Sequence, residues 1–149
     1  MKPSPDSFSL DSGVLIEMLL GTPAGSIFLE PLLLSAITAN TCHLNLSEAE
    51  YVLCRILGRT QARSKVDNLV RSNYINLTDA GRLYAKAAEI KCERALALGD
   101  CYTIANAEVT GSIAFFAFRE EELKREMERK PFDVEIRFTE GLPRTGSPS

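Results

Sequence analysis

Acidic residues stand next to apolar segments at several separated points of the chain. Asp11 ends the first apolar run, Glu48 and Glu50 follow the second, and Asp100 opens a small-residue segment before the third. Glu120 comes shortly after that third run. Because ligands in an open parallel sheet bind beyond the carboxyl ends of its strands, we expect these carboxylates to converge on one rim.

Carboxylates gathered on one rim need a counter-charge. They raise one another's pKa when they lie a few ångströms apart, and Mg²⁺ or Mn²⁺ relieves this repulsion because hard cations bind oxygen ligands. A metal held in this way lowers the pKa of a bound water and stabilises the charge on a phosphate. The pattern of acids therefore predicts metal-dependent phosphodiester hydrolysis.

Each acid also has a purely structural interpretation. Asp100 could be the N-cap of its helix, and Ser47 with Glu50 has the spacing of a capping box. Glu120 could be a charge favoured in the first turn of a helix. Asp11 is harder to explain in this way, since an acid that ends an apolar strand adds little packing. Taken together the acids favour a metal site, and one carboxylate can serve as both cap and ligand.

Other catalytic chemistries find little support in the chain. His43 is the only histidine, which argues against a Ser-His-Asp triad, and we expect it to be structural and inside a strand. No Walker loop or glycine-rich dinucleotide motif is present. Zinc is not expected, because the cysteines form no CxxC pair and have no companion histidines. These cysteines are Cys42, Cys54, Cys92 and Cys101.

Length and composition indicate one domain. The chain has 149 residues, of which 45% are hydrophobic, and we expect a domain over residues 1–140 with a flexible tail at 141–149. The N-terminus lacks the apolar core of a signal peptide, so a cytoplasmic location is expected. A net charge of −3 gives no overall attraction to nucleic acid. The basic residues of Arg55–Ser72 would then form a local RNA-binding patch or a solvated helical face.

Apolar runs alternate with helical patterns, which predicts an α/β fold with a largely parallel sheet. The expected strands are Phe8–Asp11, Thr41–Leu46, Tyr74–Leu77, Ser112–Phe118 and, at an edge, Phe132–Phe138. The expected helices are Val14–Leu20, Ala24–Ala39 with a kink or break at Pro31, Ser47–Leu57 ended by Gly58, Ala62–Ser72, Asp79–Ala95 capped by Thr78, Asp100–Val109 and Glu120–Arg129.

At these acids the chain resembles PIN-domain proteins over roughly residues 7–138. Asp11-Ser12 after a short strand resembles the first family motif, and Leu46-Ser47-Glu48-Ala49-Glu50-Tyr51 resembles the second. Asp100-Cys101-Tyr102-Thr103-Ile104-Ala105-Asn106-Ala107, an acid opening a small-residue helix, resembles the third. The fourth position departs from the family pattern: Phe118-Arg119-Glu120 places Glu120 at the metal position and lacks the family's hydroxyl residue.

The resemblance implies a three-layer α/β/α fold around a largely parallel sheet of four to five strands. It also implies a nuclease that uses Mg²⁺ or Mn²⁺, with Asp11, Glu50 and Asp100 as metal ligands and catalytic residues, and Glu120 as the fourth. Glu50 is preferred to Glu48 because it lies three residues after Ser47. Many small prokaryotic members are VapC-type toxins, which implies an RNA substrate, an antitoxin partner and a homodimer.

Two other functions are considered. The same fold could serve as an RNA-binding or regulatory module whose catalytic site has degraded. A winged-helix DNA-binding regulator is the third hypothesis, because Glu48–Leu57, Ala62–Ser72 and Tyr74–Arg82 resemble the helices and wing of such proteins. That hypothesis gives no role to Asp11 and Asp100.

Overall fold

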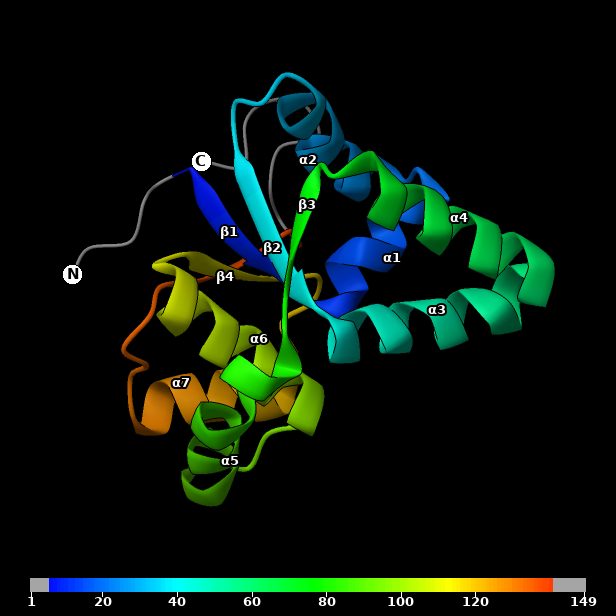
Figure 1. Cartoon of the computed structure of the whole chain (residues 1–149). Helices are drawn as coiled ribbons and strands as arrows, with labels where there is room; N and C mark the ends of the chain where they lie inside the picture. Colours follow the sequence, from blue (N-terminus) through cyan, green and yellow to red (C-terminus); the bar gives the residue numbers. More distant parts are fainter. Residues whose placement is uncertain (1–5, 141–149) are drawn as a thin grey trace.

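The computed structural model describes residues 6–140 and shows helices packed on both faces of a central sheet (Figure 1). The strands are β1 (Ser7–Leu10), β2 (Thr38–Cys42), β3 (Ile75–Thr78), β4 (Ile113–Phe116) and β5 (Ile136–Phe138). The helices are α1 (Ser12–Leu20), α2 (Pro23–Leu33), α3 (His43–Leu57), α4 (Arg59–Ser72), α5 (Tyr84–Glu93), α6 (Leu98–Thr110) and α7 (Glu121–Arg129), and a 3₁₀ turn, η1, spans Ala80–Arg82.

The sheet has the order β3-β2-β1-β4-β5, and each neighbouring pair is parallel. Helices α1 to α4 cover one face, and α5 to α7 cover the other (Figure 1). The predicted three-layer α/β/α fold is therefore confirmed. The chain moves outward from β1 in one direction through β2 and β3 and in the other through β4 and β5. The strand order thus switches beside β1, which is where open α/β sheets bind their ligands.

Alternate residues of the strands build two apolar cores. Phe8 of β1 and Phe115 of β4 meet Phe28 of α2 in edge-to-face contacts, with ring centroids 4.8 to 6.0 Å apart. All three rings are fully buried. On the opposite face, Phe116 packs with the core of α5, α6 and α7. The side-chain alternation of β4 thus joins both helical layers to one strand.

The second strand and its flanking helices differ from the predicted boundaries. β2 spans Thr38–Cys42 rather than Thr41–Leu46, and the preceding helix ends at Leu33 rather than Ala39. β2 buries the polar side chains of Asn40 and Thr41, which a hydropathy pattern does not predict to lie in a core. The Thr41 hydroxyl donates to the Leu10 carbonyl over 3.1 Å, and the Asn40 amide donates to the Phe8 carbonyl over 3.3 Å. Pro31 lies inside α2.

The starts of α3, α4 and α5 also differ from the prediction, each by three residues or more. α3 begins at His43 rather than Ser47, so the placement of His43 inside a strand and the capping box at Ser47 were both wrong. α4 begins at Arg59, directly after Gly58, which ends α3 as predicted and has a φ of 89°. The predicted helix Asp79–Ala95 is divided, because the Asp79 carboxylate accepts the Gly81 amide over 2.8 Å and caps η1 before α5 starts.

The C-terminal strand is shorter than predicted. Only Ile136–Phe138 of the predicted Phe132–Phe138 pairs with β4, and it forms an edge of the sheet as expected. The predicted flexible tail at 141–149 lies outside the described residues. A five-stranded parallel sheet excludes the winged-helix hypothesis, which allows only a small hairpin.

Within residues 6–140 no single helix is long and apolar enough to cross a membrane. By length and composition α1 and α2 pass that test only as a pair, and they are bent by 88° relative to each other.

Candidate active site

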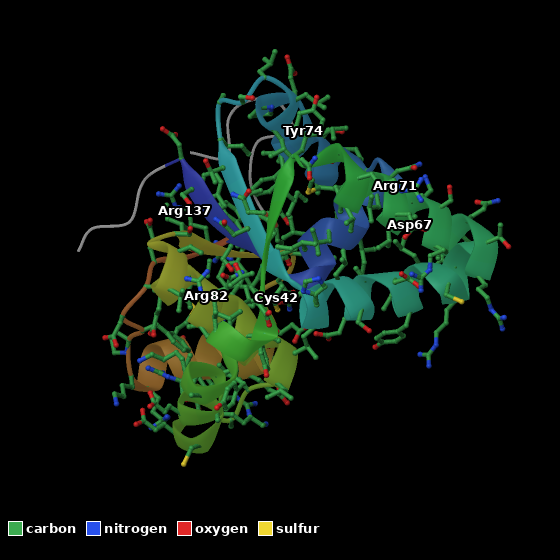
Figure 2. The ribbon with its side chains drawn as sticks, in the orientation of Figure 1. Cys42, Asp67, Arg71, Tyr74, Arg82 and Arg137 are labelled. Carbon is green, nitrogen blue, oxygen red and sulfur yellow. The ribbon has the colours of Figure 1, made fainter. Side chains whose placement is uncertain are left out.

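A cavity of about 290 Å³ opens at the carboxyl end of the sheet, between the ends of β1 and β4. Cys42, labelled in Figure 2, marks the end of β2 at this same edge. Four segments that are distant in the sequence contribute carboxylates to the cavity lining. These carboxylates are Asp11, Glu48, Asp100 and Glu120.

Asp11 follows β1 and is the N-cap of α1. One carboxylate oxygen accepts the Gly13 amide over 3.3 Å, and the other accepts the Thr103 hydroxyl over 3.2 Å. Burial raises the pKa of the Asp11 carboxyl, while hydrogen bonds from Gly13, Ser12 and Thr103 lower it and nearby Glu120 raises it further. Asp11 is thus held in one orientation but remains poorly compensated as an anion.

A buried polar network connects Asp11 to the starts of α3 and α6. The Asn45 amide donates both to the Thr103 hydroxyl and to the Gly99 carbonyl, each over 3.2 Å. The Asn45 amide oxygen in turn accepts the Cys42 thiol over 2.9 Å. Sequence reasoning missed Asn45 and Thr103. Their spacing was the available signal, since each lies three residues from an acid of the cavity, Asn45 before Glu48 and Thr103 after Asp100.

Glu48 projects from α3 over the start of α6. Its Oε1 atom is buried without a hydrogen-bond partner in the described structure. The carboxylate occupies the space above Gly99, where an added Cβ would lie 2.1 Å from Oε1. Burial raises the pKa of Glu48, and Asp11 raises it further. An unpaired carboxylate oxygen of this kind lacks a partner that a cation would supply.

Glu50 does not reach this cavity, although the sequence analysis placed it in the metal site. It lines a separate groove between α3 and α4, where its carboxylate pairs with Arg63 at 2.7 Å. Residues two positions apart on a helix point about 200° away from each other. Because α3 already begins at His43, the side that faces α6 contains Asn45 and Glu48 rather than Glu50.

Asp100 is the third residue of α6 and not its N-cap. The cap position belongs to Ala97, which makes no side-chain capping bond, so the interpretation of Asp100 as a cap was wrong. Burial, followed by the charges of Asp11, Glu120, Glu48 and Glu122, raises the pKa of Asp100 to about 7. This acid is therefore destabilised as an anion first by its burial and then by the acids around it.

Glu120 is exposed and precedes α7, where it occupies the N-cap position without a side-chain capping bond. The other end of α7 is held by Arg94, whose guanidinium donates to the Lys130 carbonyl over 2.6 Å and lies 3.6 Å from the Phe132 ring centroid. Arg94 also pairs with Glu126 of α7 at 3.8 Å. Arg94 thus anchors the C-terminal end of α7, while Glu120 stands at the opposite end of the helix, where it lines the cavity.

The cavity chemistry suits a divalent cation. The lining residues of the described cavity include four carboxylates and no Lys, Arg or His. Among residues 6–140 no three His, Cys, Asp or Glu side chains are already arranged as a metal site. The donors are nevertheless all oxygen, they repel one another, and one of them is buried without a partner. Mg²⁺ and Mn²⁺ bind such oxygen donors and complete their shells with water.

The remaining candidates lie away from this cavity. His43 is exposed and lines the α3–α4 groove together with Arg55 and Arg63 of the basic segment. Arg55 stacks on Tyr51 with its guanidinium carbon 5.0 Å from the ring centroid. The cysteines are all free thiols: Cys42 and Cys101 are buried, Cys54 is partly buried and Cys92 is exposed.

Solved structures of low sequence identity share this fold. The VapBC2 complex of Rickettsia felis, bound to a DNA fragment from its promoter, superposes with a TM-score of 0.62 at 14% identity, covering 89% of this chain and 98% of the other. VapC20 of Mycobacterium tuberculosis, described as a toxin that cleaves the sarcin-ricin loop, superposes with a TM-score of 0.61 at 16% identity. The match covers 80% of this chain and 94% of VapC20. A toxin-antitoxin complex from Klebsiella pneumoniae superposes with a TM-score of 0.57 at 13% identity, and the match covers 96% of this chain and 98% of the other.

No sequence among the curated proteins matches the chain significantly. The family model of the PIN domain matches residues 9–125, which include Asp11, Glu48, Asp100 and Glu120. The chain therefore belongs to the PIN-domain family.

Proposed function

We propose that this chain is an endoribonuclease that requires Mg²⁺ or Mn²⁺. The observation that supports this most strongly is the convergence of Asp11, Glu48, Asp100 and Glu120 on one cavity, which no basic residue among 6–140 lines. Burial and mutual repulsion make this set unfavourable without a cation, since burial first and the neighbouring acids second raise the pKa of Asp100. Membership of the PIN-domain family supports a nuclease.

In this proposal Asp11, Glu48 and Asp100 hold the cation, and Glu120 completes the set from the exposed side. Glu48 takes the place that the sequence analysis gave to Glu50. When bound, a divalent cation supplies a polarised water as nucleophile and positive charge for the phosphate. Thr103 keeps the Asp11 carboxylate turned toward the cavity, and Asn45 keeps the Thr103 hydroxyl in place.

RNA as substrate and a role as the toxin of a toxin-antitoxin pair are supported by the structural neighbours. The Mycobacterium tuberculosis neighbour is described as cleaving the sarcin-ricin loop, and two other neighbours are a VapBC complex and a toxin-antitoxin complex. We infer that an antitoxin binds this chain and that the chain itself acts as a homodimer in the cytoplasm. The exposed Arg59 and the half-buried Lys65 of α4 would then contact the RNA backbone.

One observation favours a second candidate function, RNA binding without catalysis. The fourth acid, Glu120, is exposed, and Phe118 occupies the position where the family has a hydroxyl residue. Such a protein would retain RNA but would not cleave it when Mn²⁺ is added.

The deciding experiment is cleavage of a structured RNA with Mn²⁺ or EDTA, using wild type, Asp100→Asn, Glu48→Gln and Glu50→Gln. We expect Mn²⁺-dependent cleavage that falls by at least about tenfold in Asp100→Asn and Glu48→Gln, since changes at or beside a metal ligand have effects of this size. Glu50→Gln is the matched control, because it changes the same functional group on the same helix outside the cavity. Equal activity in all four proteins would contradict the assignment, and RNA binding without cleavage in wild type would favour the second function.

A further inference from the structure

Phe118 is a large aromatic residue that is left exposed at the edge of the acidic cavity. It lines the cavity together with Phe116 and Leu123, but they are 3% and 2% exposed, whereas Phe118 is 58% exposed. Single exposed apolar residues are common on protein surfaces, but among the residues that line this cavity Phe118 is the large apolar one that stays exposed. Phe118 is therefore a candidate binding residue rather than part of the core.

The backbone beneath Phe118 is fixed by the chain that continues from β5. The Ala117 carbonyl accepts the Thr139 hydroxyl over 3.0 Å and the Glu140 amide over 3.1 Å. The Glu140 carboxylate accepts the Arg119 amide over 2.8 Å, and the Phe118 carbonyl accepts the Glu120 amide over 3.0 Å. These bonds hold the backbone on both sides of Phe118, so its side chain leaves the chain from a fixed point at the edge of the cavity.

The chemistry of the cavity indicates what the ring binds. Four carboxylates and no basic side chain line the described cavity, so its lining repels a polyanion until a cation is bound. A nucleobase carries no charge and presents a flat π face that stacks on aromatic side chains whatever the base.

We propose that Phe118 is a stacking platform for an unpaired nucleobase next to the phosphate that is cleaved. This inference rests on the proposed nuclease function and adds a binding role for one residue, since the ring needs a base that is unstacked in a loop or single strand. A base within a regular duplex is already stacked on both faces and would not reach the ring.

The chain offers a direct probe, because it contains no tryptophan. Phe118→Trp would place the only indole at the proposed platform, and Tyr74→Trp is the matched control. Tyr74 is 44% exposed and lies just before β3, at the end of the sheet opposite Cys42 (Figure 2). With Ca²⁺ in place of Mn²⁺, which neutralises the acids of the cavity while slowing cleavage, a short single-stranded RNA should quench the Phe118→Trp fluorescence. The Tyr74→Trp protein should not respond, and neither protein should respond to an abasic oligonucleotide.

Affinity measurements on three proteins complete the test. Phe118→Ala should weaken RNA binding about tenfold, which equals about 1.4 kcal/mol, whereas Phe118→Tyr should bind within about twofold of wild type. The weakening should persist at high salt, unlike the loss of a phosphate contact. Because Phe118 is exposed, thermal melting of these variants should match wild type.

The outcomes separate this inference from the proposed function. Fluorescence that RNA leaves unchanged, with equal affinity in Phe118→Ala, would overturn the stacking role even if wild type cleaves RNA with Mn²⁺. Unchanged RNA affinity combined with weaker self-association of Phe118→Ala in sedimentation would assign the ring to a protein contact and also overturn it. If wild type neither binds nor cleaves RNA, the nuclease proposal and this inference both fail.

Discussion

Asp100→Asn should stabilise the metal-free protein at neutral pH, although it removes a proposed ligand. The pKa of Asp100 is about 7 in the folded chain, against an ordinary value of 3.8. The folded chain therefore keeps a proton between about pH 4 and pH 7 that the unfolded chain has released. Stability consequently falls as pH rises through this interval, and the cost of the buried charge is fully present above pH 7.

The size of the effect follows from that difference in pKa. At about 1.4 kcal/mol per pH unit, the charge costs at most about 4 kcal/mol above pH 7. Because side chains and water relax around the charge, we expect Asp100→Asn to gain about 2 to 4 kcal/mol. Asparagine has nearly the same shape as aspartate, which keeps the packing constant. The gain should disappear near pH 4, where the carboxyl is neutral in both states.

Urea unfolding from pH 4 to pH 8 measures the difference in free energy of unfolding between wild type and Asp100→Asn, first with EDTA and then with Mn²⁺. Wild type should gain stability from Mn²⁺ as ligand binding requires, and Asp100→Asn should not, so the order of the two proteins reverses. Glu50→Gln is the control: its carboxylate pairs with an exposed arginine, so the change should cost less than about 1 kcal/mol and should not affect the response to Mn²⁺. An Asp100→Asn protein that is less stable than wild type at pH 8 in EDTA, or a gain that does not vary with pH, would refute the reasoning.

Three further changes test the packing around the site. Gly99→Ala should leave the melting temperature nearly unchanged but weaken Mn²⁺ binding in a calorimetric titration, because the new Cβ displaces only the flexible end of Glu48. Unchanged Mn²⁺ affinity would contradict the placement of Glu48 in the metal site. Thr103→Val removes the hydroxyl that orients Asp11, so it should lower the free energy of unfolding in urea by about 1 to 3 kcal/mol and weaken Mn²⁺ binding. If stability and Mn²⁺ affinity both match wild type, this hydrogen bond is dispensable. Phe115→Ala should cost about 3 to 5 kcal/mol by the same urea assay with no effect specific to metal, and a loss below about 1 kcal/mol would mean that the aromatic cluster repacks.

Much of the architecture was available from the sequence. The alternation of apolar runs and helical patterns predicted the parallel sheet, and Asp11 could be placed because it ends a short apolar strand. The positions of Asp100 and Glu120 next to β4 in the chain were enough to bring them to the same edge as Asp11. Local pattern suffices for such features, because strand direction in a parallel sheet decides which ends meet.

The choice between Glu48 and Glu50 depended on tertiary structure. It is a question of helix phase, since an error of two positions turns a side chain to the other side of the helix. The phase of α3 follows from its start at His43, which in turn follows from the pairing of β2 with β1 through the polar residues Asn40 and Thr41. A hydropathy pattern does not predict such pairing, because the buried polar side chains of β2 make their hydrogen bonds to β1, a strand distant in the sequence.

The sequence by itself thus determined the fold class, the family resemblance and three of the acids that share the cavity, because each follows from patterns local to one element. Only the tertiary structure decided that Glu48 joins them, that Asn45 and Thr103 orient Asp11, and that Phe118 remains exposed beside them. These last features are contacts between elements distant in the chain, and their geometry is set by packing that no single segment encodes.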